Sequence, residues 1–267
     1  MALTHLLADG PTHASAGTGA RDARDARGPG GARGSRAKPK LAKAVFIDKD
    51  GTLVEDVPYN VDPALLRFTA NAVDGLRLLV DAGYLLVVVT NQPGVALGRF
   101  DHDALRRLQG ALTQMLREAG VPLAGFQACP HAPAAPGGMA ACQCRKPAPG
   151  MLRQAAAHLE LDLAASWMVG DILDDVEAGH RAGCRSVLLD VGNETVWERT
   201  LLRTPDLVAT DLLGAAQAII ARDGGNARNT GNTGHTRARA LPHPAGPAAV
   251  TASPSGTLTK EAGRWIG

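Results

Sequence analysis

The sequence of 267 residues lacks a long hydrophobic run. Its longest strongly apolar stretch is 84–89, whereas a helix needs roughly 18–20 apolar residues to cross a bilayer. The first residues show no basic segment followed by an apolar core, so no secretory signal is readable. Neither the GxGxxG nor the GxxxxGK[ST] pattern occurs, which leaves nucleotide sites of those types unsupported. We therefore expect a cytoplasmic protein without membrane association.

Cysteine is scarce as well, and its placement is uneven. Three of the four cysteines, Cys129, Cys142 and Cys144, fall within 16 residues, whereas Cys184 stands alone. In a chain with no readable signal, this spacing favours a metal cluster over a disulfide framework.

Large apolar residues are sparse at both ends of the chain. Residues 1–40 and 223–267 hold 22 of the 48 Gly and Pro residues, yet seven of their 85 residues are Leu, Ile, Val or Phe. Such segments bury too little apolar surface to offset the entropy lost on ordering. We expect one domain, 41–222, between a disordered basic tail, 1–40, and a disordered low-complexity tail, 223–267.

The net charge of +2 hides opposite signs. The two tails carry 12 Lys or Arg against five Asp or Glu, and residues 41–222 carry 16 against 21. An acidic body disfavours nucleic acid as a specific partner, although loose basic tails attract polyanions weakly.

Apolar runs alternate with helical periods between residues 43 and 222. Four runs are typical of buried parallel strands and a fifth of a short edge strand: 43–48, 84–90, 166–170, 185–190 and 206–209. Helical spacing occupies the segments around them: 73–83, 105–120 after an N-cap at Asp101, 151–159, 172–182 and 212–222. This alternation predicts an α/β fold, a Rossmann-like parallel sheet with helices on both faces. In such sheets, ligands bind beyond the carboxyl ends of the strands.

Two carboxylates follow the first predicted strand, in Asp48-Lys-Asp50-Gly-Thr52. Residues two apart on an extended segment point to one side, so Asp48 and Asp50 can address one ligand. A carboxylate can attack phosphorus, but two anions facing a phosphate repel it unless a divalent cation intervenes. Mg²⁺ prefers such oxygen ligands. The alternative is that both acids are solvated turn residues.

A second acidic group, Asp171-Ile-Leu-Asp174-Asp175, follows the run at 166–170. Asp171 stands at the strand end, where it would complete the same Mg²⁺ site, and Asp175 falls one helical turn later on the same side. The alternative is that these acids favour the start of the next helix through its dipole. Both interpretations can hold together.

Groups suited to a phosphate occur at two further places. The central strand ends in Thr90-Asn91-Gln92, and Arg145-Lys146 precedes Pro147 in a turn. A hydroxyl and an ammonium that converge on one phosphate neutralise charge building on its oxygens. Singly, Thr90 could just satisfy a strand end and Lys146 could be a surface charge.

The cysteine cluster includes a histidine. Cys129-Pro-His131 and Cys142-Gln-Cys144 flank ten residues rich in Ala, Pro and Gly. Three thiolates and one imidazole form the closed tetrahedral set typical of structural Zn²⁺. The alternative, three buried thiols and a surface histidine, suits such a loop poorly because it offers little core. Because Cys144 is bonded to Arg145, zinc would preorganise the cation pair and leave no open position for water.

Four of these groups follow one another along the chain: the paired acids at 48–52, the polar strand end at 90–92, the cations at 145–147 and the second acidic group at 171–175. In this order they resemble the motifs of the haloacid dehalogenase-like phosphatases, and the resemblance covers essentially all of residues 43–222. The resemblance implies that Asp48 is the nucleophile, forming an aspartyl-phosphate, and that Asp50 is the general acid/base. It implies that Thr90 and Lys146 hold the phosphoryl group. It also implies that Mg²⁺ is bound by Asp48, the carbonyl of Asp50 and Asp171. Asp50 would protonate the departing alkoxide and then take a proton from water.

Within that family, the runs DKDGT, TNQPG and CRKPxPGM and the Cys/His loop look like the D-glycero-D-manno-heptose 1,7-bisphosphate 7-phosphatase group. That group acts in nucleotide-heptose and lipopolysaccharide core synthesis. The resemblance implies short loops and a zinc-binding loop insertion in place of a large cap domain, and we expect a monomer. Ile172 departs from the lysine common there. The residues expected to bind the sugar phosphate substrate are Asp56, Val57, Pro58, Tyr59, Asn91, Gln92, Pro93 and Arg145.

Two other functions remain open. Histidinol-phosphate phosphatases share the fold, the catalytic groups and the zinc loop, and a free-standing form fits because residues 223–267 are too short and polar for a fused dehydratase domain. A zinc-stabilised binding module without catalysis is the alternative from another class. It is disfavoured because a binding module needs none of the five phosphatase residues as a set: Asp48, Asp50, Thr90, Lys146 and Asp171.

Overall fold

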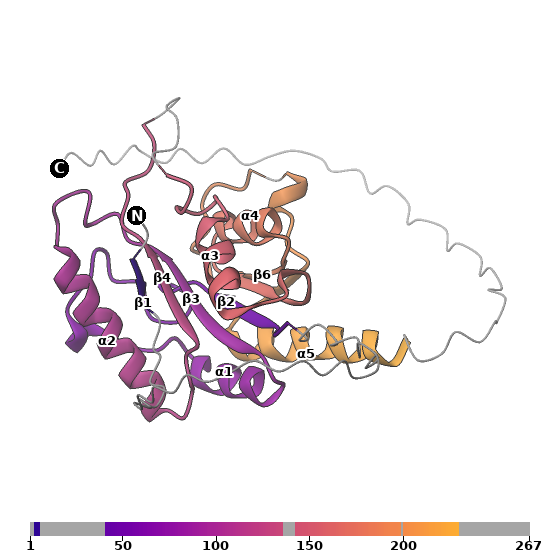
Figure 1. The fold of residues 1–267 in the computed structure, drawn as a ribbon. Helices are drawn as coiled ribbons and strands as arrows, with labels where there is room; N and C mark the ends of the chain where they lie inside the picture. The colour runs from indigo at the N-terminus through magenta and orange to yellow at the C-terminus, as the bar shows by residue number, and fades with distance from the viewer. Residues whose placement is uncertain (1–2, 6–40, 136–141, 199, 230–267) are drawn as a thin grey trace, which may run out of the picture.

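The computed structural model of the protein describes residues 3–5, 41–135, 142–198 and 200–229, and Figure 1 shows their arrangement. One sheet has the strand order β1-β4-β3-β2-β5-β6-β7. Six of its strands run parallel, while β1 pairs antiparallel with β4. The strands are β1 (Leu3–His5), β2 (Ala44–Ile47), β3 (Leu85–Asn91), β4 (Gly125–Cys129), β5 (Trp167–Gly170), β6 (Arg185–Leu189) and β7 (Leu207–Ala209).

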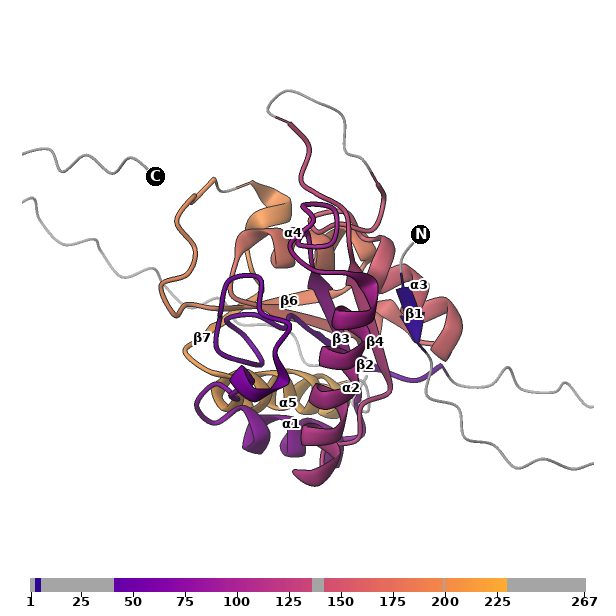
Figure 2. The same cartoon turned by 90° about the vertical axis from the view of Figure 1, so that its left-hand side faces the viewer.

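Helices cover both faces of the sheet, which confirms the predicted α/β class (Figure 2). One face packs against α1 (Ala72–Asp81), α2 (His102–Glu118) and α5 (Leu212–Asn229), and the other against α3 (Gly150–Leu159) and α4 (Leu173–Ala182). The alternation of side chains along β2 divides the core accordingly, because Val45 and Ile47 join the first cluster and Phe46 the second. Three short 3-10 helices complete the elements: η1 (Pro63–Leu65), η2 (Leu163–Ala165) and η3 (Leu201–Arg203).

The helix ends follow from local chemistry. The carboxylate of Asp101 accepts a hydrogen bond from the Ala104 amide at 2.7 Å, as expected of the N-cap of α2. Gly120 follows the same helix with φ +74° and Gly183 follows α4 with φ +99°, a left-handed conformation that glycine adopts without strain. The segment 48–71 holds η1 and two isolated bridges, Asp50 to Val54 and Val54 to Phe68, and no large cap domain.

Strand β4 is missing from the sequence-based prediction. Its residues, GFQAC, include a glycine and a glutamine and no β-branched residue, so the segment has little of the composition typical of a strand. In the fold it pairs with β3, with Asn91 opposite Cys129, and Phe126 and Ala128 are buried. The first zinc-ligand candidate, Cys129, is therefore anchored at the end of a sheet strand.

Two elements lie outside the predicted bounds 41–222. Leu3–His5 forms β1 on the edge of β4. The helix α5 continues past residue 222 to Asn229. Just beyond residue 222, the carboxylate of Asp223 accepts hydrogen bonds from the Tyr84 hydroxyl and from Trp167 Nε1 at 3.3 Å, and pairs with Arg185 at 2.6 Å. The remaining residues of both tails, 1–2, 6–40 and 230–267, lie outside the described residues.

We expect a chain that ends at residue 222 to be less stable than one that ends at residue 229. Loss of Asp223 leaves the hydroxyl of buried Tyr84 and the indole N–H of Trp167 without an acceptor, which costs about 1–3 kcal/mol. Urea unfolding of the two chains measures the difference. Asp223→Asn in the longer chain isolates the contribution of the carboxylate, and equal free energies of unfolding for all three proteins would contradict the prediction.

Within the ranges that the structure describes, no helix combines the length and apolar character that a membrane span requires.

Candidate active site and metal centre

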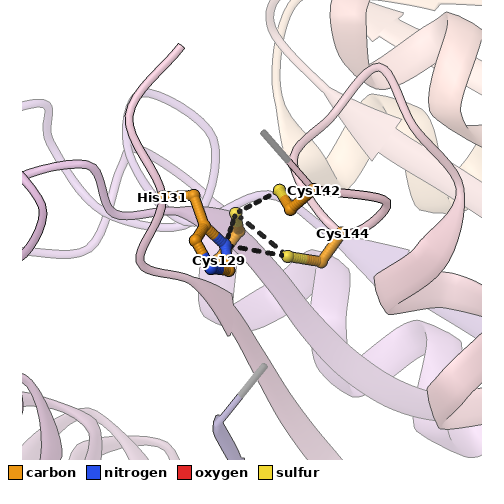
Figure 3. A group of neighbouring side chains, drawn as sticks. All are labelled: Cys129, His131, Cys142 and Cys144. Atoms are coloured by element: carbon orange, nitrogen blue, oxygen red, sulfur yellow. Dashed lines mark hydrogen bonds between the residues drawn. The ribbon is translucent and has the colours of Figure 1, made fainter. Parts of the chain in front are cut away.

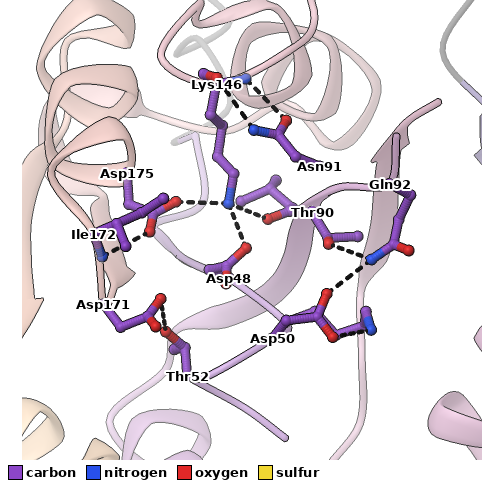
Figure 4. A network of polar contacts seen from close by, with 12 residues as sticks. Asp48, Asp50, Thr52, Thr90, Asn91, Gln92, Lys146, Asp171, Ile172 and Asp175 are labelled. Carbon is purple, nitrogen blue, oxygen red and sulfur yellow. Dashed lines mark hydrogen bonds and ion pairs between the residues drawn. The ribbon is translucent and has the colours of Figure 1, made fainter. Parts of the chain in front are cut away.

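The candidate site lies at the carboxyl edge of the three central strands. Asp48 follows β2 directly, Thr90 is near the end of β3, and Asp171 follows β5 (Figure 4). The amide of Asp48 donates to the carbonyl of Val169 at 2.9 Å, which continues the pairing of β2 with β5 up to the site. Parallel strands thus bring together residues that are far apart in the sequence.

Three carboxylates meet at this edge. Asp48, Asp171 and Asp175 each offer an oxygen atom within 4.8 Å of the others, and all three residues are buried. The ammonium of Lys146 pairs with Asp48 and, at 2.6 Å, with Asp175, and it donates to the carbonyl of Val89 at 3.0 Å. Burial alone would lower the pKa of Lys146, but the carboxylates of Asp175 and Asp48 raise it, so this ammonium stays charged.

Asp171 is held on both of its oxygens. The Thr52 hydroxyl donates to Oδ1 at 3.1 Å and the Asn193 amide donates to Oδ2 at 2.7 Å. Burial and the charge of Asp48 raise the pKa of Asp171 to about 6. Negative charge is therefore costly at this position until a cation offsets it.

Asp50 is also held on both oxygens, by different partners. Its Oδ1 pairs with the ammonium of Lys49, and its Oδ2 accepts from Gln92 Nε2 at 2.8 Å. Gln92 lies 3.0 Å from the hydroxyl of Thr90 as well. Burial raises the pKa of Asp50, and the nearby Lys49 ammonium opposes that rise.

The side chain of Asn91, one of the expected substrate-binding residues, is bonded to the backbone of Lys146. Its side-chain amide donates to the carbonyl of Lys146 at 3.1 Å, and its side-chain oxygen accepts from the Lys146 amide at 3.0 Å. This two-way contact joins the end of β3 to the turn that carries the lysine.

Asp56, the first residue of the expected substrate-binding loop, lines a cavity together with Thr52 and Asn193. Asp56, Pro58 and Tyr59 are exposed and Val57 is half-buried. Tyr59 has φ +56°, and the guanidinium of Arg99 lies over its ring, 5.4 Å from the centroid.

Two other expected substrate residues lie near the Cys/His loop. Pro93 comes directly after Gln92, whose amide donates to the carbonyl of Cys129 at 2.7 Å. The guanidinium of Arg145 donates to the His131 carbonyl at 3.3 Å and its amide to the thiol of Cys142 at 3.3 Å. Arg145 also lines a 410 Å³ cavity together with Asp174 and Arg181.

The three cysteines and the histidine converge at one point (Figure 3). Cys129 Sγ lies 3.7 Å from Cys142 Sγ and 3.3 Å from Cys144 Sγ, and His131 Nδ1 lies 3.5 Å from Cys129 Sγ and 3.3 Å from Cys144 Sγ. A tetrahedral Zn²⁺ with bonds of about 2.3 Å to sulfur and about 2.0–2.1 Å to nitrogen places its ligand atoms about 3.5–3.8 Å apart. The four side chains therefore fit a structural zinc ion.

The carboxylate cluster in turn fits a hard divalent cation. The three clustered carboxylates, those of Asp48, Asp171 and Asp175, face the single ammonium of Lys146, while Asp50 is paired separately with Lys49. Carboxylate oxygens that outnumber the neighbouring cations, in a buried site, are ligands suited to Mg²⁺.

Comparison with known proteins agrees with this geometry. Residues 143–215 match a family model described as "HAD-hyrolase-like", the haloacid dehalogenase (HAD) type. The chain is 38% identical over 184 residues to D-glycero-beta-D-manno-heptose-1,7-bisphosphate 7-phosphatase of Yersinia pestis, an alignment that covers 67% of this chain and 96% of that relative. The chain belongs to the HAD-like phosphatases. As a member, it is a phosphoric monoester hydrolase.

Other HAD-like phosphatases resemble it to a similar degree. The relative of the same name from Escherichia coli (strain K12) is 37% identical over 183 residues, which cover 67% of this chain and 95% of the relative. The crystal structure of D,D-heptose 1.7-bisphosphate phosphatase from B. bronchiseptica, complexed with magnesium and phosphate, superposes with a TM-score of 0.57 at 31% identity. It covers 67% of this chain and 99% of that one.

Four residues of this HAD-like phosphatase contact the site without having been assigned to it from the sequence: Lys49, Thr52, Asp175 and Asn193. Asp175 had a signal, because helical spacing places it on the side of Asp171. Lys49 and Thr52 are sequence neighbours of Asp48 and Asp50, but whether their side chains point into the site depends on the conformation of the turn after β2. The sequence gives no indication for Asn193, because this residue lies in the loop after β6.

Proposed function

We propose that this protein is a magnesium-dependent phosphatase that removes the 7-phosphate of D-glycero-D-manno-heptose 1,7-bisphosphate. The observation that carries the proposal is the 38% identity over 96% of a relative with that name. The clustered carboxylates and lysine at the carboxyl edge support it, since they are the groups that phosphoryl transfer needs.

In the proposed reaction, a carboxylate oxygen of Asp48 attacks phosphorus as the bond from phosphorus to the sugar oxygen breaks. The products of this step are an aspartyl-phosphate and an alkoxide, which takes a proton from Asp50. Asp50 then accepts a proton from the water that attacks the aspartyl-phosphate, and Asp48 and inorganic phosphate are released. Lys146 and Thr90 would orient the phosphoryl group: Lys146 pairs with Asp48, and Thr90 is buried near the end of the neighbouring strand β3.

Two metal ions belong to this proposal. Asp48, Asp171 and the backbone carbonyl of Asp50 would hold Mg²⁺, which supplies positive charge beside the transferring phosphate when bound. Cys129 and the three other ligands of its cluster, His131, Cys142 and Cys144, would hold a structural Zn²⁺ that takes no part in hydrolysis.

Substrate recognition is assigned to the rim of the site. Arg145 would bind the distal phosphate, and the loop from Asp56 to Tyr59 would close over the sugar, with Gln92 and Pro93 in the substrate-binding turn. Asn91 would act through Lys146, to whose backbone it is bonded. We further propose that the enzyme acts as a monomer in the cytoplasm, in nucleotide-heptose and lipopolysaccharide core synthesis.

A substrate panel tests the proposal. Purified protein with Mg²⁺ is assayed for phosphate release from both anomers of heptose 1,7-bisphosphate and from histidinol phosphate. We expect the highest kcat/KM for a heptose bisphosphate, with the β anomer first because the relatives carry that name. A preference for histidinol phosphate would overturn the substrate assignment while leaving the phosphatase family intact.

We expect Asn193→Ala to raise the Mg²⁺ concentration needed for half-maximal activity by about 10-fold or more. The amide holds Oδ2 of Asp171 at 2.7 Å, and loss of a group that orients a metal ligand costs about 10–100-fold in metal affinity. Calorimetric titration of the protein with Mg²⁺ measures affinity apart from turnover. Gln114→Ala on the exposed face of α2 is the control, and unchanged Mg²⁺ affinity in Asn193→Ala would contradict the prediction.

A further inference from the structure

The side chain of Lys49 is one of the few charged groups buried in the described part of the fold. The residue is 2% exposed, and its ammonium pairs with Oδ1 of Asp50. An ammonium moved out of water is destabilised unless an opposite charge and good geometry compensate. The two buried lysines of the site pair with different carboxylates, because Lys146 pairs with Asp48 and Asp175 and not with Asp50.

The backbone around Lys49 is fixed by the turn that follows β2. Its carbonyl accepts from the amides of Leu53 at 3.0 Å and Val54 at 2.9 Å, both of which are buried. These bonds fix the backbone of Lys49 relative to the sheet, and with it the direction from which its side chain approaches Asp50.

Both oxygens of the Asp50 carboxylate, the partner of Lys49, are bonded. Lys49 binds Oδ1 of Asp50 and Gln92 binds Oδ2 at 2.8 Å, and these two donors come from the turn after β2 and the end of β3. The Asp50 side chain nevertheless keeps 27% of its surface exposed. It is thus fixed in orientation and still open to a reacting group.

We propose that Lys49 is a positioning residue for proton transfer: its buried ammonium fixes the Asp50 carboxyl where it meets the departing sugar oxygen. The inference rests on the proposed function, in which Asp50 is the acid/base. As the bond from phosphorus to oxygen breaks, the proton of Asp50 passes to the alkoxide and leaves a carboxylate. Lys49 then faces that carboxylate, the form that accepts a proton from water in the second step.

The test compares two leaving groups in single-turnover experiments with excess enzyme and Mg²⁺. One substrate is the alkyl phosphate monoester that the wild-type protein hydrolyses fastest, which needs a proton at the leaving oxygen. The other is p-nitrophenyl phosphate, whose leaving group departs unprotonated. We expect Lys49→Met to slow the first about 10²-fold and release of p-nitrophenol less than about threefold, because general acid catalysis contributes about 10²–10⁴-fold to the first alone.

Two further variants complete the design. Lys49→Arg keeps the charge and should recover most of the rate with the alkyl phosphate. Lys43→Met is the matched control: the same substitution just before β2, where the ammonium lies 3.7 Å from the centroid of the Tyr84 ring, should alter neither rate.

An equal loss with both substrates, with no recovery in Lys49→Arg, would overturn the inference and leave Lys49 a structural residue. If Lys49→Met does not fold, Lys49→Gln takes its place in the same comparison. Because the alkyl phosphate is chosen by the wild-type rate, a failure of heptose bisphosphate as substrate refutes the proposed function separately and leaves this test intact.

Discussion

Replacing Asp48 by asparagine is expected to lower phosphatase activity by at least about four orders of magnitude, as loss of a catalytic nucleophile does in other enzymes. Asp48 is buried at the end of β2, beside Lys146 and Asp171, where a reacting phosphate would meet it. The amide of asparagine is a poor nucleophile toward phosphorus and also removes one negative charge from the proposed Mg²⁺ site. Phosphate release under saturating Mg²⁺ measures the effect.

Two additional measurements separate the nucleophile from a structural role. Wild-type protein quenched in acid during turnover should carry phosphate on Asp48, detectable by mass spectrometry, and Asp48→Asn should carry none. Asp74→Asn, an exposed carboxylate on α1, serves as control and should keep full activity. Full activity of purified Asp48→Asn would refute the assignment.

The second large effect is expected at the Cys/His cluster. Cys144→Ser should lose the zinc ion, of which we expect about one per chain from the four-ligand set, and should lower kcat/KM by about 10²-fold. The reason is distance: Cys144 is two residues from Lys146, and a displacement of about 1 Å in a catalytic group can cost about 10²-fold. Elemental analysis and steady-state kinetics measure the two quantities.

Cys184→Ser is the matched control for this variant. Cys184 is buried under α4 and packs with the same apolar cluster as Cys129, but it lies outside the four-residue group. Burial raises its pKa to about 12, so its thiol stays protonated. It should retain zinc and activity. Zinc-free wild-type protein purified without chelator would contradict the structural-zinc proposal.

Much of this arrangement follows from local patterns in the sequence. The apolar runs that end in Asp48, Thr90 and Gly170 predict three parallel strands, and the rule that ligands bind at their carboxyl ends places the acidic residues together. The spacing of the cysteines likewise predicts the cluster that the structure brings together around His131.

What the sequence could not predict depends on contacts between distant segments. Strand β4 has a weak pattern of its own and forms because β3 offers a partner edge and α2 covers it. The contact of Asn193 with Asp171 spans 22 residues, and that of Asp223 with Tyr84 spans 139. Such pairings are set by packing of the whole domain, not by propensity near either residue.

The division of the core between the two faces of the sheet has a practical consequence for protein engineering. The larger apolar cluster lies with α1, α2 and α5, whereas Asp175 belongs to α4 and the turn with Lys146 leads into α3 on the opposite face. On the outer surface of α1 and α2, exposed Asp74 pairs with Arg77 and exposed Gln114 bonds Glu118, so these side chains contact residues of their own helices. Solvent-facing positions of this kind are where thermostability can be tuned while the reacting groups at the carboxyl edge of the sheet are left in place.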